Sequence, residues 1–598
     1  MMYQKTHFLQ QVFLIGLLVC YSQQYVLPRS ANNEQYFENG AVATDVPACS
    51  AMGRDILARN GSAVDAAISS LLCIGVVNPQ SSGLGGGLSM VVYTKETQTA
   101  EALMALEKAP GAANPDMFSM FSSKRDASKY GVNSIAVPGE LRGMWEAHQR
   151  YGVLPWADLF APVINMAESG FRLTKHVPYV LSLGSMQAYD DIQNMYKHED
   201  GSLKTEGDLQ YAPTLAATLR KIADNGCDEF YTGSVAQDLV QDIQDEVAKL
   251  LQNGITVNEN VLVTADDLRN YAVSWEPVES TTFKNNIQMY STPLTASGPV
   301  LQYILNVLDE YDITNDDFST TAKKLLLYHR YLEATKFGFA LRSHLGDNLS
   351  SSLVIKVLNA LRSKQFAANT ADEINDAYVT HANRKDYDIS QDIPDEEEGL
   401  GDTSHVSVLA ANGDAVSVTT SVGLYYGSRF YSNRTGLFLN DHMANFYFPG
   451  RASDPIWNLP SANGIEPGRM YMTTTCPSML VNSDGAVKMV VGASGGSRII
   501  SANAWVILRA LWMGASIEDA IEERRIYHFL SSSNVAYEER FSRSDRFSWT
   551  IRTKLEDEMG HDVRYSSQYA CVQGILADDQ GGIYAHSDSR KGGLAAGY

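Results

Sequence analysis

The segment that decides the fold is TSHVSVLAANGDAVSVTTS, residues 403–421. Polar and apolar residues alternate on both sides of Asn412-Gly413, a dipeptide that favours a tight hairpin turn. The preceding stretch, residues 386–401, is rich in carboxylates and ends in glycine, which is typical of a solvated linker. The sequence therefore predicts a β-hairpin that begins where an exposed linker ends, with the hydroxyl residue Thr403 in first place.

This order predicts a protein that cuts its own chain. Cleavage before Thr403 places a free α-amino group beside the Oγ of the same residue, and the amine can then act as the base. No separate histidine is needed. N-terminal nucleophile hydrolases have this layout, but an ordinary exposed hairpin shows the same alternation and is favoured on spacing alone.

A glycine-rich segment, GASGG at residues 492–496, follows a predicted strand at residues 488–491. A helix is expected after it, from about Ser501 to Met513. One interpretation is a nucleophile elbow of the G-x-S-x-G type, in which Ser494 works with His586 and a later aspartate as a serine hydrolase. The repeated strand–helix units of a parallel sheet are missing upstream, which makes this the second choice.

The alternative gives the same glycines a supporting role. The backbone N–H groups of Gly495 and Gly496 would then form an oxyanion hole for a nucleophile elsewhere in the chain. A second glycine-rich stretch, residues 83–87, lies between a helix and a strand. That order is the reverse of a phosphate-binding loop. We therefore expect these glycines to admit another backbone at close range.

A helical hairpin is expected near the start of the chain. Residues 49–59 form one helix, Asn60-Gly61 breaks it, and Ser62 caps a second helix with Asp65 three residues later. Cys49 and Cys73 then both fall at the open end of the hairpin. A disulfide between them is favoured in an oxidising compartment, and two buried thiols are the alternative.

The composition indicates a large acidic globular protein. The chain has 598 residues, 47 basic against 69 acidic side chains, and 44% hydrophobic residues. A net charge of −22 argues against nucleic acid as a partner, because phosphates would be repelled. No spacing typical of metal ligands and no nucleotide motif is evident, so no metal or cofactor is expected. Further helices are predicted at residues 214–223, 298–308 and 321–341.

The N-terminal region predicts secretion. The apolar run at residues 12–20 is about half the roughly 20 residues that span a bilayer. Residues 1–22 are therefore interpreted as a secretory signal, with an uncleaved anchor that tethers the protein outside the cell as the alternative. Three glycosylation sequons agree with this route, at Asn60, Asn348 and Asn433.

Beyond the signal region, nearly the whole chain resembles the γ-glutamyltransferases, also called glutathione hydrolases. The matching segments are residues 60–67, 83–88, 137–140, 297–301, 328–330, 476–477 and 587–593. The resemblance implies an α+β fold, an αββα sandwich built from a large subunit (residues 23–402) and a small subunit (residues 403–598). It implies self-cleavage between Asp402 and Thr403, a heterodimer of the two products, and γ-glutamyl compounds such as glutathione as substrates.

The resemblance also assigns roles to single residues. Thr403 matches the family's nucleophile, Gly495 and Gly496 match its oxyanion hole, and Ser421 stands at its second threonine. The family's serine pair corresponds to Thr473 and Thr474. We expect self-cleavage to be retained, since the Thr403 hydroxyl and the nearby hydroxyls of Ser407 and Ser421 are present.

The positions that hold the charged ends of a γ-glutamyl group are changed. Leu106 stands where the family has an arginine for the α-carboxylate, and Lys108 is a weak substitute for it. The three positions for the α-ammonium are Gly423, His442 and Asn445. Each lost partner costs about 2–5 kcal/mol, and about 1.4 kcal/mol is tenfold in rate. We therefore expect activity on glutathione to be lower by about a thousandfold or more. The alternatives are an active enzyme with another donor, or the serine hydrolase above.

Overall fold

The computed structural model of the chain describes residues 35–381, 384–387, 401–449, 461–530, 534–538 and 549–598. The predicted signal at residues 1–22 and most of the acidic linker lie outside these residues. Within the described ranges, no helix has both the length and the apolar character needed to cross a membrane.

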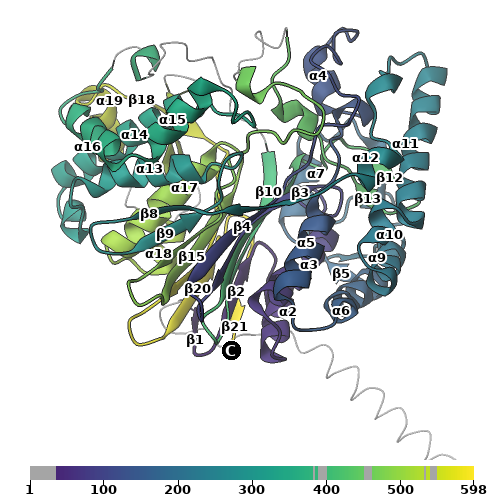
Figure 1. Cartoon of the computed structure of the whole chain (residues 1–598), viewed down its shortest axis with the longest axis horizontal. Coiled ribbons are helices and arrows are strands. Elements are labelled where there is room, and N and C mark those ends of the chain that lie inside the picture. Colours follow the sequence, from purple (N-terminus) through teal and green to yellow (C-terminus); the bar gives the residue numbers. More distant parts are fainter. Residues whose placement is uncertain (1–34, 382–383, 388–400, 450–460, 531–533, 539–548) are drawn as a thin grey trace, which may run out of the picture.

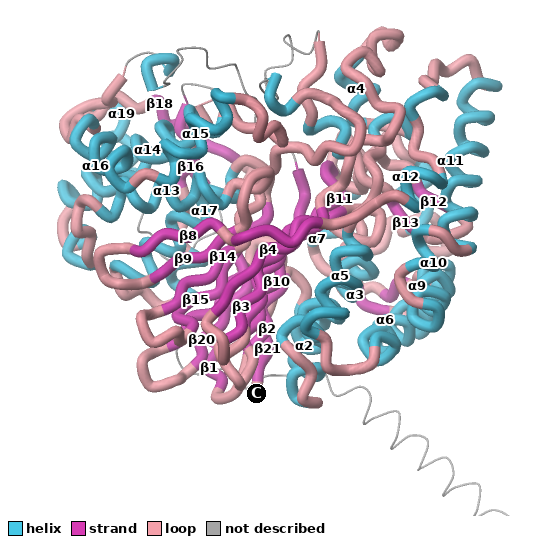
Figure 2. The backbone as a smooth tube through the Cα atoms, viewed as in Figure 1, coloured by secondary structure: helices cyan, strands magenta, loops and turns pink. Residues whose placement is uncertain are grey.

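Two antiparallel sheets of seven strands form the centre of the molecule (Figures 1 and 2). The first has the order β21 (Ala596–Gly597), β2 (Ala41–Thr44), β10 (Gly401–Leu409), β11 (Ala415–Leu424), β3 (Gly87–Thr94), β4 (Thr99–Ala105) and β7 (Ser274–Pro277). The second has the order β1 (Gln35–Phe37), β20 (Ile583–Ser587), β19 (Cys571–Ala577), β15 (Val487–Ser494), β14 (Ser478–Val481), β9 (Gln288–Ser291) and β8 (Glu279–Thr282).

Helices cover the outer face of each sheet, so the layers run helix, sheet, sheet, helix (Figure 2). On the side of the first sheet lie α2 (Pro47–Ala58), α3 (Ala63–Val77), α4 (Lys124–Lys129), α5 (Glu140–Tyr151), α6 (Trp156–Ser169), α7 (His176–Ser182), α8 (Asp190–Met195), α9 (Pro213–Asn225), α10 (Asp228–Tyr231), α11 (Ser234–Gln252) and α12 (Ala265–Arg269). On the side of the second lie α13 (Gly298–Asp309), α14 (Thr321–Arg342), α15 (Ser352–Arg362), α16 (Lys364–Glu373), α17 (Arg498–Ile507), α18 (Ile517–Glu522) and α19 (Trp549–Asp557).

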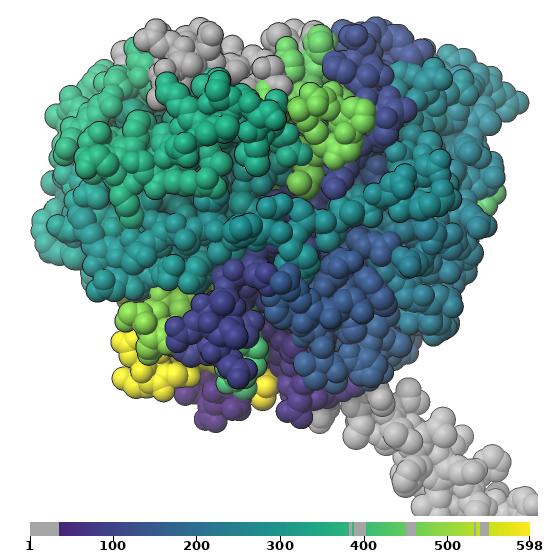
Figure 3. All heavy atoms as spheres, viewed as in Figure 1, coloured from purple at the N-terminus to yellow at the C-terminus, as the bar shows by residue number. Residues whose placement is uncertain are grey.

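Short strands complete the structure outside the sandwich. They form three small sheets, from β5 (Phe171–Arg172) and β6 (Leu209–Gln210), from β12 (Tyr431–Ser432) and β13 (Leu437–Phe438), and from β16 (Ile526–Tyr527), β17 (Asn534–Glu538) and β18 (Asp562–Ser566). The two ends of the described chain meet, since β2 pairs with β21 and β1 with β20. The space-filling view shows them side by side at one end of the molecule (Figure 3).

The central hairpin is buried on both faces, so the alternative of an ordinary exposed hairpin is wrong. The apolar side chains of β10 and β11, such as Val406 and Val418, pack under the helices of the first sheet. The polar side chains point between the two sheets, where Ser407 Oγ donates to the Gln573 carbonyl and Ser417 Oγ donates to the Val491 carbonyl. Hydroxyl groups can be buried here because each finds a partner on the facing sheet.

The helical hairpin is as predicted. Ser62 and Asp65 form a reciprocal capping box at the start of α3, and Cys49 and Cys73 are joined in a disulfide with their Cα atoms 5.4 Å apart. The glycines of residues 83–87 do admit a close backbone. A Cβ on Gly86 would lie 2.2 Å from the Ser421 carbonyl oxygen. One boundary differs, since α17 begins at Arg498 rather than near Ser501 and continues as a π-helix over Leu508–Trp512.

Candidate active site

The predicted cleavage site lies at an irregularity in the central hairpin. Thr403 pairs with Ser421 but Asp402 pairs with Gly423, so β11 has one extra residue at this point. The Thr403 hydroxyl, on a residue only 5% exposed, donates to Ser421 Oγ at 3.3 Å. The Ser421 hydroxyl in turn donates to the Asp402 carbonyl oxygen at 2.8 Å. One hydroxyl therefore contacts both the predicted nucleophile and the carbonyl group beside the predicted cut.

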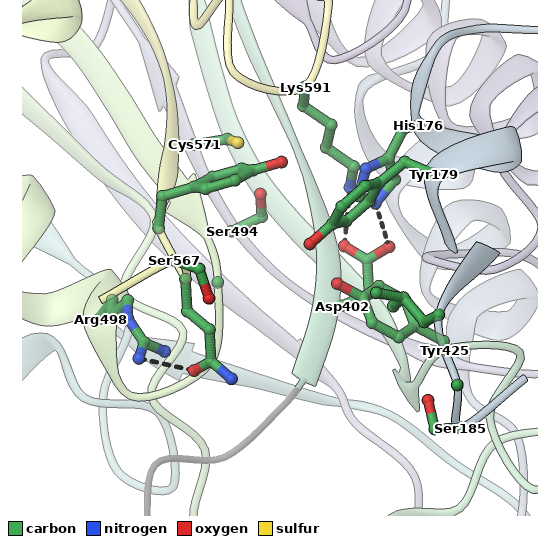
Figure 4. Close-up of a pocket in the computed structure, with 15 residues that line it drawn as sticks. His176, Tyr179, Ser185, Asp402, Tyr425, Ser494, Arg498, Ser567, Cys571 and Lys591 are labelled. Carbon is green, nitrogen blue, oxygen red and sulfur yellow. Dashed lines mark hydrogen bonds and ion pairs between the residues drawn. The ribbon is translucent and has the colours of Figure 1, made fainter. Parts of the chain in front are cut away.

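The side chain of Asp402 is held by three groups from distant parts of the chain, of which Figure 4 draws His176 and Lys591. Ser81 Oγ donates to its Oδ2 at 2.5 Å, and His176 Nε2 lies 2.8 Å from the same oxygen. Lys591 Nζ donates to Oδ1 at 3.0 Å and to the Thr403 carbonyl oxygen at 2.7 Å. Lys591 thus contacts the residues on both sides of the bond between Asp402 and Thr403.

Charge balance keeps Asp402 ionised. Burial acts to raise the pKa of its carboxyl group, but Lys591 and His176 outweigh burial and hold the pKa well below its usual range. Burial likewise acts to lower the pKa of Lys591, and the carboxylates of Asp402 and Asp45 raise it instead. Asp45 Oδ2 lies 2.8 Å from Lys591 Nζ. The bond that the chain is predicted to cut is therefore fixed by a buried ionic network.

A pocket of about 260 Å³ opens next to Asp402 (Figure 4). The rings of Tyr179, Tyr425 and Tyr569 form much of its wall. The rest of the wall includes Ser494 and Gly495 at the end of β15 and Arg498 at the start of α17. Gly495, one of the two predicted oxyanion-hole residues, therefore lines the same pocket as Asp402.

The two glycines have backbone conformations that other residues rarely adopt, with φ of 123° at Gly495 and 60° at Gly496. A Cβ on Gly495 would lie 2.8 Å from the Ala570 Cα. Thr474, one of the predicted substrate-binding residues, donates its hydroxyl to the Gly496 carbonyl at 2.8 Å. Its neighbour Thr473 is 9% exposed and accepts a bond from Thr475 N at 3.3 Å.

The geometry contradicts the serine hydrolase interpretation. Ser494 ends β15, whose neighbours in the sheet are antiparallel, whereas a nucleophile elbow belongs to a parallel sheet. Ser494 pairs with Cys571, while His586 pairs with Gly574 on the far side of β19. At about 3.3 Å per residue and about 4.8 Å per strand, their Cα atoms are roughly 14 Å apart. His586 instead lies 2.9 Å from Glu522.

The position that the resemblance gives to arginine is apolar. Leu106 is 2% exposed and belongs to a hydrophobic cluster with Met443, Phe446 and Tyr471. Lys108 does not replace the arginine. Its Nζ donates to the Ala272 carbonyl at 2.7 Å and lies 5.3 Å from the centre of the Tyr271 ring.

The imidazole of His442 contacts the buried carboxylate of Glu107. Its Nδ1 lies 2.6 Å from Glu107 Oε1, and both side chains are buried. Tyr471 donates its hydroxyl to Glu107 Oε2 at 2.9 Å, and its ring stacks on the imidazole at 4.5 Å. Because Glu107 accepts from two donors, the imidazole is fixed in place beside Leu106.

Gly423 adopts a φ of 102°, and the space for a side chain there is already filled. A Cβ at this position would lie 1.8 Å from Asp441 Oδ1 and 3.3 Å from His442 Nε2. Burial raises the pKa of Asp441 to about 6, although His442 and Lys129 lower it.

Asn445 ends the short helix that His442 begins, and its backbone oxygen accepts from Asn463 Nδ2 at 2.7 Å.

One group of side chains could offer ligands to a metal. Within the residues that the structure describes, it consists of His329, Glu333 and His561. The His329 Nδ1 and His561 Nε2 atoms share a hydrogen bond of 2.8 Å. Glu333 accepts from Lys336 Nζ at 2.6 Å and from Tyr387 at 2.8 Å. Since these ligand atoms already have partners, the group is better described as a buried polar network.

Comparison with known proteins agrees with this geometry. The family model described as gamma-glutamyltranspeptidase matches residues 49–598. The chain belongs to the γ-glutamyltranspeptidase family. Among its relatives, scoloptoxin SSD14 of Scolopendra dehaani is 36% identical over 98% of this chain and 97% of its own. Glutathione hydrolase 5 proenzyme of Rattus norvegicus is 33% identical over 94% of this chain and 93% of its own.

A solved structure confirms the fold of this γ-glutamyltranspeptidase homologue. Cephalosporin acylase from Bacillus halodurans superposes with a TM-score of 0.75 at 23% identity, covering 96% of this chain and 98% of that one. At this identity the likeness concerns the fold alone. The fold is the predicted αββα sandwich of the N-terminal nucleophile hydrolase type.

Several residues of this site in the γ-glutamyltranspeptidase homologue were not predicted from the sequence, among them Lys591, Glu107, His176 and Asp441. Lys591 lies inside a segment that carried the resemblance, and Glu107 directly follows Leu106, to which the resemblance gave a role, so the sequence did point to their neighbourhood. His176 and Asp441 gave no signal. His176 comes from a helix 226 positions before Asp402, and Asp441 matters only because the bulged hairpin brings Gly423 against it.

Proposed function

We propose that this protein is a secreted γ-glutamyltransferase-like protein that cleaves itself between Asp402 and Thr403 and has lost most of its activity on glutathione. Cleavage yields a large subunit, residues 23–402, and a small subunit, residues 403–598. The two stay together as a heterodimer, because β10 of the small subunit pairs with β2 of the large one.

The contacts of Ser421 support self-cleavage. Thr403 Oγ attacks the carbonyl carbon of Asp402, the bond from that carbon to Thr403 N breaks, and the proton of the hydroxyl ends on the freed amine. Water then hydrolyses the ester to give the Asp402 carboxylate and a Thr403 with a free amino group. Ser421 is placed to stabilise the oxyanion, since it already donates to the Asp402 carbonyl.

Leu106 is the single observation that carries the loss of activity. A γ-glutamyl group brings an α-carboxylate that needs a charge-assisted partner once water is removed. The residue at this place is apolar and buried among other apolar side chains, and the nearby Lys108 is bound elsewhere. Loss of that one partner costs about 2–5 kcal/mol. The histidine at position 442, where the family has a glutamate or glutamine for the α-ammonium, adds to the loss.

The test compares glutathione hydrolysis by the purified, processed protein with that of processed rat glutathione hydrolase 5. We expect kcat/KM to be about a thousandfold lower. Comparable turnover would refute the proposed loss. Denaturing gels of the wild type and of Thr403→Ala test self-cleavage separately. A single uncut band in both would refute that part.

Secretion is supported by the disulfide between Cys49 and Cys73 and by the sequons. Asn60 and Asn433 are exposed, and Asn348 is half-buried. Expression in a secreting eukaryotic cell followed by glycosidase digestion tests this. We expect the protein in the medium and a drop in its apparent mass, and retention inside the cell without glycan would contradict it.

A further inference from the structure

We propose that the first sugar of a glycan on Asn433 packs into a neighbouring aromatic pocket and stabilises the hairpin formed by β12 and β13. The proposal rests on the secretion that belongs to the proposed function, because a chain receives this glycan on the secretory route. It does not depend on activity toward glutathione. It gives one of the three predicted sequons a structural role, and it gives the pocket a ligand, an N-linked sugar ring.

Asn433 differs from the other sequons in the residue two positions before it. Tyr431 holds this place in the segment YSNRT, residues 431–435. Alanine holds it in the Asn60 sequon, and glycine holds it in the Asn348 sequon. Side chains two positions apart in an extended chain point to the same side. The ring of Tyr431 is therefore placed to meet a sugar on Asn433.

The contacts of the hairpin tip support this orientation. Ser432 Oγ donates to Asp242 Oδ2 at 2.6 Å, Arg434 N donates to the same oxygen at 2.9 Å, and the Arg434 guanidinium also pairs with this carboxylate. Asp242 belongs to α11, against which β12 packs (Figure 1). Residues 432 and 434 therefore face α11. By alternation, Tyr431 and the exposed Asn433 face away from it.

The side of the hairpin that carries Tyr431 borders a pocket of about 210 Å³, which we call the Tyr431 pocket. The chain between β6 and α9 forms its opposite wall. Five aromatic rings line the pocket, those of Phe171, Tyr196, Tyr211, Tyr431 and Phe438. Gly436, just after the sequon, lines it as well, and none of the described lining residues carries a charge. Residues on both sides of the sequon therefore belong to the pocket.

Two of the rings are fixed and one is open to solvent. Tyr431 packs against Phe438, its partner across the hairpin, with ring centres 4.9 Å apart. Tyr211 is 49% exposed, and a Cβ on Gly170 would lie 2.8 Å from its ring. A ligand that covers exposed aromatic surface removes that surface from water, which is favourable.

A single sugar ring suits the Tyr431 pocket. One face of such a ring presents C–H bonds and can pack on an aromatic ring, while the hydroxyl groups at its edge stay in water. The sugar is neutral, as is the lining of the pocket. The volume is below the about 300–1,000 Å³ of typical small-molecule sites, which favours one ring over a longer ligand. We expect the rest of the glycan to stay in solvent.

The folded hairpin buries the other essential residue of the sequon. Thr435 is fully buried, its hydroxyl donates to Ser432 Oγ at 2.6 Å, and its carbonyl oxygen accepts from Thr218 at 2.7 Å. Glycosylation requires the threonine, so the sugar is attached before the hairpin folds. The hairpin then closes with the sugar in place, and the packing of the sugar contributes to the stability of the closed form.

Hydrogen exchange in the hairpin tests the proposal. The full chain is secreted from cells that make only high-mannose glycans, and endoglycosidase H trims each glycan to its first sugar. Mass spectrometry then measures the occupancy of Asn433 and the amide exchange of residues 431–438. We expect exchange there to be about 3- to 10-fold slower than in Asn433→Gln, the effect of one aromatic contact. Asn348→Gln is the matched control and should exchange like the wild type.

Tyr431→Leu tests the assignment to the aromatic ring. Leucine keeps an apolar side chain but has no flat face. Exchange is compared with and without the sugar in this background, so the destabilisation caused by the substitution itself cancels in the ratio. We expect the sugar to slow exchange by less than about twofold here. The same protection as in the wild type would overturn the assignment to Tyr431.

The outcomes also separate this proposal from the proposed function. Absence of glycan from all three sequons would overturn both this proposal and the proposed secretion. Glycan on Asn60 or Asn348 with none on Asn433 would overturn this proposal alone. Equal exchange in the wild type and in Asn433→Gln, with Asn433 occupied in the wild type, would do the same.

Discussion

Replacing Ser421 with alanine should almost stop self-cleavage. Three hydrogen bonds of this residue disappear with the hydroxyl. It donates to the Asp402 carbonyl at 2.8 Å, accepts from the Thr403 hydroxyl at 3.3 Å and accepts from Gly423 N at 3.0 Å. The first stabilises the negative charge that develops on the carbonyl oxygen, and the second orients the attacking hydroxyl.

The magnitude follows from the first of these bonds. Removing one donor from an oxyanion site costs about 100- to 1000-fold in rate. Loss of the orienting bond to Thr403 adds to this, but the two effects act on the same step and are not independent. We therefore expect the cleavage rate of Ser421→Ala to fall by about 100- to 1000-fold or slightly more.

The assay follows the uncut chain and its two fragments on denaturing gels over time. Ser417→Ala is the control, because Ser417 is buried on the same strand, points to the same side and makes two hydrogen bonds of 3.0 Å that do not touch the cleavage site. It should destabilise the protein to a similar degree and still cleave. Ser421→Thr keeps the hydroxyl and should cleave. Wild-type cleavage by Ser421→Ala, or equal slowing by Ser417→Ala, would refute the reasoning.

Other predictions concern stability. The folded state raises the pKa of Asp441 to about 6, so it binds a proton that the unfolded chain releases near pH 4, and stability falls as the pH rises between these values. Asp441→Asn should therefore raise the melting temperature at pH 8 but not at pH 4; a lower melting temperature at pH 8 would contradict this. Burial raises the pKa of Glu140 to about 8, so Glu140→Gln should gain stability relative to wild type as the pH rises from 5 to 9, and a pH-independent difference in calorimetry would count against it. The disulfide closes a separation of 24 residues, so Cys49→Ala/Cys73→Ala should lower the free energy of unfolding by about 3 kcal/mol in denaturant titrations, and no loss would rule out that contribution.

The candidate site shows where prediction from the sequence stops. The hydroxyls of Thr403 and Ser421 and the glycines at 495 and 496 were predicted from strand alternation, a glycine-rich turn and the family resemblance. The changes at Leu106 and His442 were also visible. The sequence did not show that His442 binds Glu107, which lies 335 positions away, because such a pairing depends on how the strands are packed.

The same limit explains why two alternatives could not be rejected from the sequence. Alternation in residues 403–421 is consistent with an exposed hairpin, and only the second sheet, lying across it, buries its polar face. The G-x-S-x-G pattern at residues 492–496 is consistent with a serine nucleophile, and only the antiparallel pairing of β15 separates Ser494 from His586.

The sequence favoured the disulfide between Cys49 and Cys73 but left two buried thiols as an alternative. By itself it determined two local elements, the hairpin at Asn412-Gly413 and the capping box at Ser62. These features depend on neighbours a few residues apart, and their side-chain chemistry is enough to specify them. Tertiary structure alone decided the ionic network around Asp402 and the contact between His442 and Glu107. Their groups come from positions far apart along the chain. Burial changes the free energy of each charged group, and the size of that change cannot be read from the neighbouring sequence.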